Sequence, residues 1–595
     1  MIVAAWALST GSLAAAEGER WLKVAAPEFT LITSLREREA VAWAGEFSQF
    51  IAALQGFIAV EVRRLPRLTI VVLARERDFA RFRPLRDDGM AMEVAGFFAR
   101  RDAWAVAGVA GAQMSEDLRS TVFHEGTHWF LSGFELPNPV WLEEGLAEVF
   151  STFTTNGKNV EWGRAIETHV DMLRLTGRMP LERLLFLGHD HLHGDGAVAA
   201  VRTDLAYAQS WAFVHYLIFG RRDVPKGALM DYVARLRQTV HPDEAFRQAF
   251  GGSYAEVDRK LGEYLQSGRY YVARQPVVAR TALAAEPAGA LEVEDALARL
   301  RMAGRRHDEA RAGVEHALTV APDDPRLHSL RGEIAQERED NEAALAAYRE
   351  AVAKGAREFK PYYEIAAAEH AAALAQDSTG ESLNAETARS IANTYERAIN
   401  LNPRYRPAYQ GLAGVVHRLP PGNAEDRRFL EYGARLFPDD GMIRLGRAIL
   451  HRRSGEDQVA RALLSSVLAT AAQQPPLVVG RARLLEAEWE QGDLQAQIDR
   501  LVKEKKFAEA IAAVEVGIAE SNLLTRPRLI ALRGNLRATQ LQDELRVAFE
   551  ERRWADARAR CDAVIESDAE FSMKSVARHY LGQLDKRGLG RKQQD

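Results

Sequence analysis

The sequence predicts an α+β domain at its N-terminal end, built on a small mixed sheet, followed by an all-α array of repeated helix pairs. Two observations lead to this prediction. Short β-branched runs alternate with helix-like segments only before about residue 115. After about residue 291, small and large apolar residues recur with a period of about 34 residues. The 595 residues suffice for both parts, since a domain usually holds about 100–200 residues.

Composition and charge exclude several classes of protein. The chain has 78 Lys and Arg against 83 Asp and Glu, a net charge of −5, and its basic residues are interspersed with acids. We therefore expect no nucleic-acid partner. The single cysteine, Cys561, excludes an internal disulfide framework and a Cys-rich zinc ribbon. No run of about 18 apolar residues occurs beyond the N-terminus, so no internal membrane segment is expected.

Residues 1–16 form an apolar segment that ends in small residues, as a secretory signal peptide does before its cleavage site. The basic start of such a peptide is missing, because Arg20 is the first positive residue. Removal of this segment as a signal peptide predicts a periplasmic or secreted protein without an integral membrane segment. If the segment is not a signal, the protein is cytoplasmic.

The strands of the N-terminal domain are predicted from short apolar runs. Two of these runs, Phe29–Thr33 and Leu68–Leu73, have the β-branched composition of buried strands. Residues 94–98 and 103–110 are separated by a short turn-like segment and predict a hairpin. Apolar residues at helical spacing predict a helix over 37–54. From Ser115, a predicted helix cap, the pattern is helical.

The motif His124-Glu125-Gly126-Thr127-His128 carries the strongest chemical signal. On a helix, residues four apart lie on one face, so both imidazoles can bind one metal ion. Glu125 lies about 100° further round, from where its carboxylate can reach a metal-bound water. A second helix is predicted over 139–150, and a turn between the two helices is long enough to bring its Glu144 back to His128. Catalytic zinc commonly takes two His, one carboxylate and water.

These residues resemble the gluzincin metallopeptidases, whose third zinc ligand is a Glu in an E-G-x-A context, here Glu144-Gly145-Leu146-Ala147. The wider string is similar to the bacterial peptidase MA-like branch, which is often fused to tetratricopeptide (TPR) repeats. The resemblance covers residues 20–270 and is closest over 115–155. It implies a zincin-like domain over 17–275 that binds Zn²⁺ through His124, His128 and Glu144. From the residues alone, Glu143 and Glu148 remain alternative ligands.

The resemblance implies two further roles. Glu148, one turn after Glu144, would orient a zinc-bound histidine, and such a contact raises the basicity of the histidine. The alternative for Glu148 is a solvated helix residue. Tyr207 follows Glu144 at the distance where gluzincins carry a Tyr or His, and it would donate a hydrogen bond to the oxyanion of the reaction, with His215 as the lesser candidate. The alternative for Tyr207 is a core tyrosine of a predicted helix.

Two segments near the motif have weaker interpretations. His189, His191 and His193 could form a second metal site, but their polar, Gly-rich context favours a loop. In gluzincins an edge strand before the zinc helix pairs with the substrate backbone, and we assign that place to 103–110. Aminopeptidases of the group carry a Glu there, whereas residues 107–111 hold no acid. This difference favours an endopeptidase.

A Pro- and Ala-rich stretch over 276–290 predicts a linker before the repeats. Apolar residues then recur with a period of about 34 residues, as in Ala310 and Val314 followed by Ala344 and Tyr348. Their spacing resembles the second helix of a TPR unit. We predict a TPR solenoid of five to seven units over 291–585 and a polar tail over 586–595; the alternative is a non-repeating helical bundle.

The sequence as a whole predicts a zinc-dependent peptidase, with Glu125 as general base and the TPR array docking a peptide or protein substrate or a protein partner. The rival from another class is a TPR interaction or scaffold protein whose zincin-like domain is structural or inactive. A zinc hydrolase acting on a non-peptide amide is a further alternative.

Overall fold

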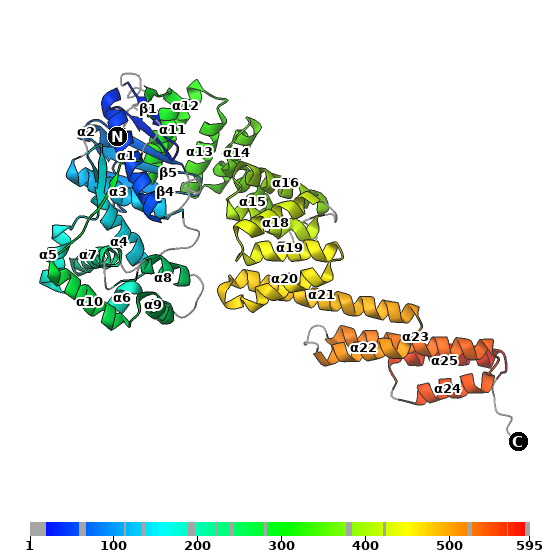
Figure 1. Cartoon of the computed structure of the whole chain (residues 1–595). Coiled ribbons are helices and arrows are strands. Elements are labelled where there is room, and N and C mark those ends of the chain that lie inside the picture. Colours follow the sequence, from blue (N-terminus) through cyan, green and yellow to red (C-terminus); the bar gives the residue numbers. More distant parts are fainter. Residues whose placement is uncertain are drawn as a thin grey trace, which may run out of the picture. The chain divides into compact units, whose positions relative to one another are not determined.

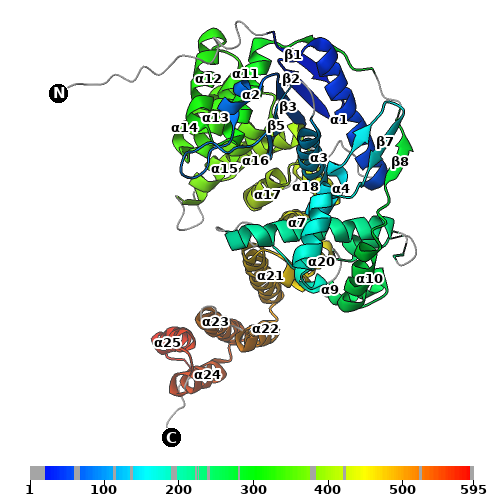
Figure 2. The same ribbon diagram turned by 90° about the vertical axis from the view of Figure 1, so that its left-hand side faces the viewer.

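The computed structural model is shown in Figure 1 and Figure 2. It describes residues 20–58, 67–111, 115–133, 139–188, 197–220, 224–225, 227–236, 242–278, 282–375, 384–419, 424–520, 526–567 and 569–589. The predicted signal segment 1–16 and the three histidines of 189–193 lie outside these residues. The chain forms two compact units, residues 1–411 and 412–595.

A six-stranded mixed sheet forms the first part of unit 1, as the sequence predicts. Its strand order is β4-β5-β3-β2-β1-β9, in which β2, β3 and β5 are parallel and the remaining pairs are antiparallel. The strands are β1 (Leu22–Ala25), β2 (Phe29–Thr33), β3 (Leu68–Leu73), β4 (Gly96–Arg100), β5 (Ala105–Ala110) and β9 (Ala285–Pro287). The sequence did not predict β1 or β9.

The sheet corrects the assignment of its edge. Residues 103–110 were expected to form the edge strand, but β5 pairs with both β3 and β4 and therefore lies inside the sheet. The edge is β4, whose other side pairs with no described strand. The unbroken apolar run of β5 suits a strand buried on both faces, which explains its interior position.

Helices cover both faces of this sheet (Figure 2). One face packs on α1 (Glu37–Ile58) and α3 (Glu116–Leu131), and the opposite face packs on α11 (Ala290–Ala303). Side chains along β3 alternate accordingly, with Ile70 and Val72 facing the first layer and Val71 facing the second. A short helix, α2 (Glu76–Phe79), follows β3.

A mainly helical region follows α3. In this region α4 packs against α7, and α5 and α6 also pack against α7. A small antiparallel sheet, β6-β7-β8, adjoins them. The elements are α4 (Val140–Ser151), β6 (Thr154–Thr155), β7 (Asn159–Trp162), α5 (Glu167–Thr176), α6 (Leu181–Leu185), α7 (Ala197–Phe219), α8 (Ala228–Leu236), α9 (Pro242–Phe250), α10 (Tyr254–Ser267) and β8 (Ala273–Pro276).

The segment 276–290, predicted as a linker, instead carries structure that joins two sheets. Strand β8 ends in it and pairs with β7, and β9 lies within it and pairs with β1. Pro276 lies in β8 and Pro287 in β9, and both strands are at the edge of their sheet, where proline is tolerated because one side of the strand has no partner. Helix α11 begins directly afterwards and packs on the sheet, so the first helix pairs belong to unit 1.

A TPR-like array of helix pairs follows, as predicted. In unit 1 the helices are α11, α12 (His307–Val320), α13 (Pro325–Glu337), α14 (Asn341–Ala353), α15 (Phe359–Ala375), α16 (Ala385–Leu401) and α17 (Arg406–Val415), the last of which runs into unit 2. The turns inside the first two pairs place Arg305 and Glu339, at equivalent positions of the repeat, in the left-handed region, with φ of 60° and 62°. A β-carbon on Gly332 would lie 2.6 Å from the ring of Tyr348, so α13 and α14 touch closely.

The first two pairs are joined to the sheet by polar contacts as well as by the core. Trp104, in the turn between β4 and β5, donates a 2.6 Å hydrogen bond to the buried carboxylate of Glu333 on α13. Arg101 of the same turn pairs with Glu337 at 2.5 Å, and the Arg299 guanidinium of α11 lies 5.4 Å from the Trp104 ring centroid. We call the face of α11 and α13 that is turned toward the sheet the inner face. This inner face is already in contact with the β4–β5 turn of the sheet.

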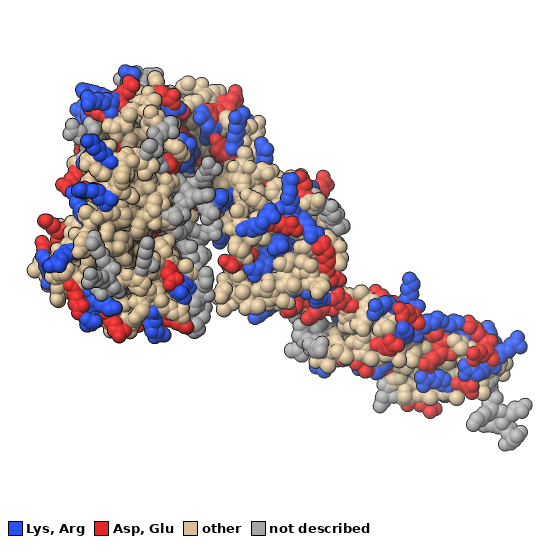
Figure 3. Space-filling model, viewed as in Figure 1, with Lys and Arg blue, Asp and Glu red and all other residues tan. Residues whose placement is uncertain are grey.

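Unit 2 contains further helix pairs. They are α18 (Ala424–Leu436), α19 (Gly441–Arg453), α20 (Asp457–Ala469), α21 (Pro476–Lys503), α22 (Phe507–Glu520), α23 (Arg526–Glu550), α24 (Trp554–Glu566) and α25 (Phe571–Lys586). The described helices include none that is long and apolar enough to cross a membrane. On the face drawn in Figure 3, acidic and basic side chains are interspersed within each unit.

Candidate metal centre

Helix α3 carries the His-Glu-x-x-His motif, and its start is well determined by local chemistry. Ser115 accepts a 3.2 Å hydrogen bond from the backbone N–H of Leu118, so it caps the helix as predicted. Glu116 and Asp117 add negative charge in the first turn, where the helix dipole favours it. Gly126, inside the motif, lets the helix lie close to the aromatic residues of α1, because a β-carbon there would lie 2.8 Å from Phe50.

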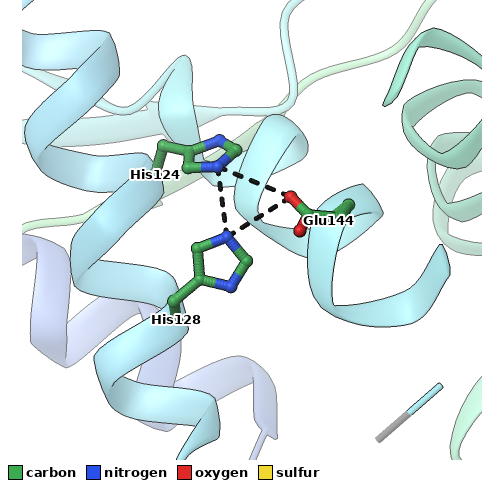
Figure 4. A group of neighbouring side chains, drawn as sticks. All are labelled: His124, His128 and Glu144. Carbon is green, nitrogen blue, oxygen red and sulfur yellow. Dashed lines mark hydrogen bonds and ion pairs between the residues drawn. The ribbon is translucent and has the colours of Figure 1, made fainter. Parts of the chain in front are cut away.

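Helix α4 brings Glu144 to the motif because it packs between α3 and α7. Three donor atoms meet there, one each from His124, His128 and Glu144 (Figure 4). The two histidine Nε2 atoms are 3.1 Å apart, and Oε2 of Glu144 lies 3.6 Å from Nε2 of His124 and 3.4 Å from that of His128. All three ligand atoms lie within 4.8 Å of one another.

The chemistry of this cluster fits a divalent transition metal. Glu144 is only 7% exposed, yet its Oε2 has no hydrogen-bond partner in the structure. A buried carboxylate oxygen without a partner is costly, and a bound cation would compensate it. Two imidazoles and one carboxylate are the donor set of catalytic zinc with a fourth position left for water. In the described part of the chain, neither Glu143 nor Glu148 joins this group.

Glu148 lies on the outer side of His124. Its Oε1 is 3.4 Å from Nδ1 of His124, and its Oε2 is 3.1 Å from Nε2 of His169 on α5. Burial alone would raise the pKa of Glu148, but the two histidines overcome burial and lower that pKa to about 2. Glu148 therefore stays ionised and contacts the nitrogen of His124 that faces away from Glu144.

The same carboxylates make the cluster attractive to a cation. Burial opposes a positive charge on His124, yet Glu148, Glu125 and Glu144 together raise the pKa of His124. A site that stabilises a proton on a buried imidazole in this way also stabilises a metal cation that replaces the proton.

Tyr207 lies beside the cluster, on α7. Its ring centroid is 6.4 Å from that of His124. Burial, together with the negative charges of Glu144, Glu148 and Glu125, raises the pKa of Tyr207 above its ordinary value, so the phenol is neutral at physiological pH and can donate a proton in a hydrogen bond.

His215, the lesser candidate for the donor to the oxyanion, does not lie where it could take that role. This side chain is fully buried, and its ring nitrogens lie 2.8 Å from the hydroxyl of Tyr264 and 2.8 Å from the carbonyl oxygen of Gly163. Burial lowers the pKa of His215 to about 4. Both nitrogens are thus engaged inside the core, and none is left to bind a substrate oxyanion.

Glu125 faces the edge strand. Together with Gly96 and Phe98 of β4, and with Thr121, it lines a mainly apolar pocket between α3 and the sheet. Glu125 thus borders the space between the motif helix and β4.

Sequence reasoning missed His169. The β6–β7 hairpin separates it from Glu148 along the chain, and no helical spacing links the two residues. Only the packing of α5 against α7 brings its ring to Glu148.

A family model described as "Protein of unknown function (DUF1570)" matches residues 119–238, a range that contains His124, Glu144, His169 and Tyr207. No curated protein matches the chain.

Several solved structures are similar to parts of the chain. YrrB, a TPR protein with an unusual peptide-binding site, is 12% identical over 32% of this chain and 90% of its own, with a TM-score of 0.25. A tetratricopeptide repeat protein from Parabacteroides merdae is 14% identical over 51% and 98%, with a TM-score of 0.21. TTC0263, a TPR protein of Thermus thermophilus, is 21% identical over 33% and 97%, with a TM-score of 0.20.

Proposed function

We propose that the N-terminal region is a zinc-dependent peptidase of the gluzincin type. The observation that carries this proposal is the convergence of His124, His128 and Glu144, with a buried and unpartnered oxygen on Glu144. Most buried polar side-chain atoms have a hydrogen-bond partner, so a buried carboxylate oxygen without one supports a bound cation at this position. Zinc held there would polarise the scissile carbonyl and lower the pKa of a bound water toward about 7.

The chain's own residues supply the remaining chemistry. Glu125 takes the proton of the attacking water and later passes it to the leaving amine. Tyr207 donates a hydrogen bond to the oxygen on which negative charge develops. Glu148 holds the ring of His124 from the side opposite Glu144, which fixes its tautomer.

Endopeptidase activity is the favoured form of the reaction. The free edge of β4 can add a substrate segment as a further strand, beside Glu125. Strand β4 has the sequence Gly-Phe-Phe-Ala-Arg and holds no acid that would select a free amino terminus. An extended stretch within a longer chain fits such an edge.

The helix pairs are proposed to bind a protein partner or substrate, and the packing limits where. The inner face of α11 and α13 already contacts the sheet through Trp104 and Arg101. A docking surface would therefore use later helix pairs. Export to the periplasm or outside the cell remains our proposal from the apolar segment 1–16.

A scaffold function is the second candidate, and one observation favours it. The sheet covers the inner face of the first two helix pairs within one compact unit, as a cap would cover the end of a solenoid. In that case the metal site would be structural or absent.

Zinc content distinguishes the two functions. Purified protein from zinc-replete expression is expected to hold one zinc ion per chain, and Glu144→Ala to lose it. Glu143→Ala is the matched control on the same helix and should keep the metal. Absence of zinc from the wild-type protein would favour the scaffold.

Turnover is tested next, with Glu125→Gln. This variant should retain zinc but cleave denatured casein at least about 100-fold more slowly, because the proton acceptor is lost. Cleavage at the wild-type rate by zinc-loaded Glu125→Gln would contradict the mechanism.

A further inference from the structure

The carboxylate of Glu148 lies between two imidazoles that come from different helices. One oxygen is 3.4 Å from Nδ1 of His124 on α3, and the other is 3.1 Å from Nε2 of His169 on α5. The three side chains form a chain that begins at the proposed metal site and ends in the core. Glu148 and His169 have side chains that are only 16% and 19% exposed.

His169 is held in place by its own helix. Val170 and Leu173 of α5 are buried, and α5 packs along α7. The His169 ring lies 5.9 Å from the ring of Trp211, which is fully buried on α7. Nε2 of His169 is buried and makes no hydrogen bond to the described residues, so its 3.1 Å ion-pair contact with Oε2 of Glu148 is the contact that holds it.

We propose that His169 is a positioning residue: it fixes the plane of the Glu148 carboxylate and, through it, the orientation of His124 as a metal ligand. The inference rests on the proposed zinc site and assigns the residue that holds its outer support. His169 touches neither the metal position nor a substrate, so its effect passes through Glu148.

The physical reason is the geometry of a carboxylate. Its two oxygens lie in one plane, and rotation of the side chain moves both of them together. A partner on one oxygen therefore limits where the other can lie. With His169 on Oε2, Oε1 stays opposite Nδ1 of His124, which keeps Nε2 of that ring turned toward Glu144 and His128. Without His169, a buried oxygen loses its partner and the carboxylate can turn away.

The test measures zinc affinity by competition with a chromophoric chelator, together with the absorption spectrum of the cobalt-substituted protein. Groups that support a metal ligand directly contribute about 10–100-fold in affinity, so Glu148→Ala should lose that much. His169→Phe keeps an aromatic ring beside Trp211 but removes the nitrogen, and we expect a loss of about 10-fold with a shifted cobalt spectrum. His169→Gln, which retains an N–H donor, should recover part of the affinity.

A double variant separates positioning from packing. If His169 acts through Glu148, His169→Phe should weaken zinc binding no further once Glu148→Ala is present. Equal losses in both backgrounds would overturn the inference, as would wild-type affinity and cobalt spectrum in His169→Phe. Absence of zinc from the wild-type protein would instead contradict the proposed function itself.

Discussion

Gly145 of α4 and Ser210 of α7 meet backbone to backbone: a β-carbon on Gly145 would lie 2.5 Å from the carbonyl oxygen of Ser210. The same β-carbon would lie 2.5 Å from the side chain of Val214. Glu144 precedes this contact on α4, and Tyr207 lies one turn before it on α7. The close approach of the two helices therefore sets how near Tyr207 can lie to the metal-binding cluster.

Gly145→Ala should force the two helices apart. We expect a loss of about 1–3 kcal/mol in unfolding free energy, as for other overpacked cores, and weaker zinc binding because Glu144 moves with α4. Urea unfolding and chelator competition measure the two effects. Gly45→Ala in α1 is the control, since its β-carbon meets nothing within 4 Å and should be neutral or stabilising. Equal stability of both variants would contradict this account of the α4–α7 contact.

Tyr207→Phe tests the proposed oxyanion donor. Removing one such donor typically costs about 100–1,000-fold in kcat, and the loss should leave KM and zinc content nearly unchanged. The measurement is steady-state cleavage of a peptide substrate with zinc determined on the same sample. A tyrosine that serves packing alone would instead lower stability and leave kcat intact.

Trp104→Phe tests the junction between the sheet and the helix pairs. The change removes the hydrogen bond to the buried Glu333 carboxylate, whose remaining ion-pair contact among the described residues is Arg299 at 3.6 Å. We expect a loss of about 1–3 kcal/mol, measured by urea unfolding. Adding Glu333→Gln should restore part of it, because a neutral amide is less costly to bury than a carboxylate. No recovery in the double variant would assign the loss to packing of the indole.

The stability of the protein should depend on pH through His215. Its pKa is about 4 in the folded chain and near 6.5 when unfolded, so between these values the unfolded state binds more protons. Stability contributed by His215 is present above pH 6.5 and is lost as the pH falls toward 4, by at most about 3 kcal/mol. His215→Gln should flatten this part of the curve of unfolding free energy against pH. An unchanged slope in the variant would contradict the assignment.

The turn of the second helix pair offers a stabilising change. Glu339 adopts φ of 62°, a conformation that costs a residue with a β-carbon about 1 kcal/mol relative to glycine. Glu339→Gly should therefore raise the unfolding free energy by up to about that amount. Ala346→Gly, at an exposed position within α14, should lower it by about 1 kcal/mol. Thermal unfolding of the two variants gives opposite shifts if the turn is as described.

The sequence by itself determined the local elements and the residues with chemical character. The strands at Phe29–Thr33 and Leu68–Leu73, the cap at Ser115 and the helix that stacks His124 over His128 all follow from patterns within a few residues. The regular spacing of small and large apolar residues determined the helix pairs in the same way, because each pair repeats one local solution.

Tertiary structure decided what depends on contacts between distant segments. It placed β5 inside the sheet and β4 at its edge, because strand order is set by pairing partners that no local pattern specifies. It placed the end of β8 and all of β9 in the predicted linker. It also brought Glu144 to the two motif histidines, Tyr207 beside them and His169 against Glu148, each from a different helix. Such contacts form only when several faces are buried together, so a single stretch of sequence does not contain them.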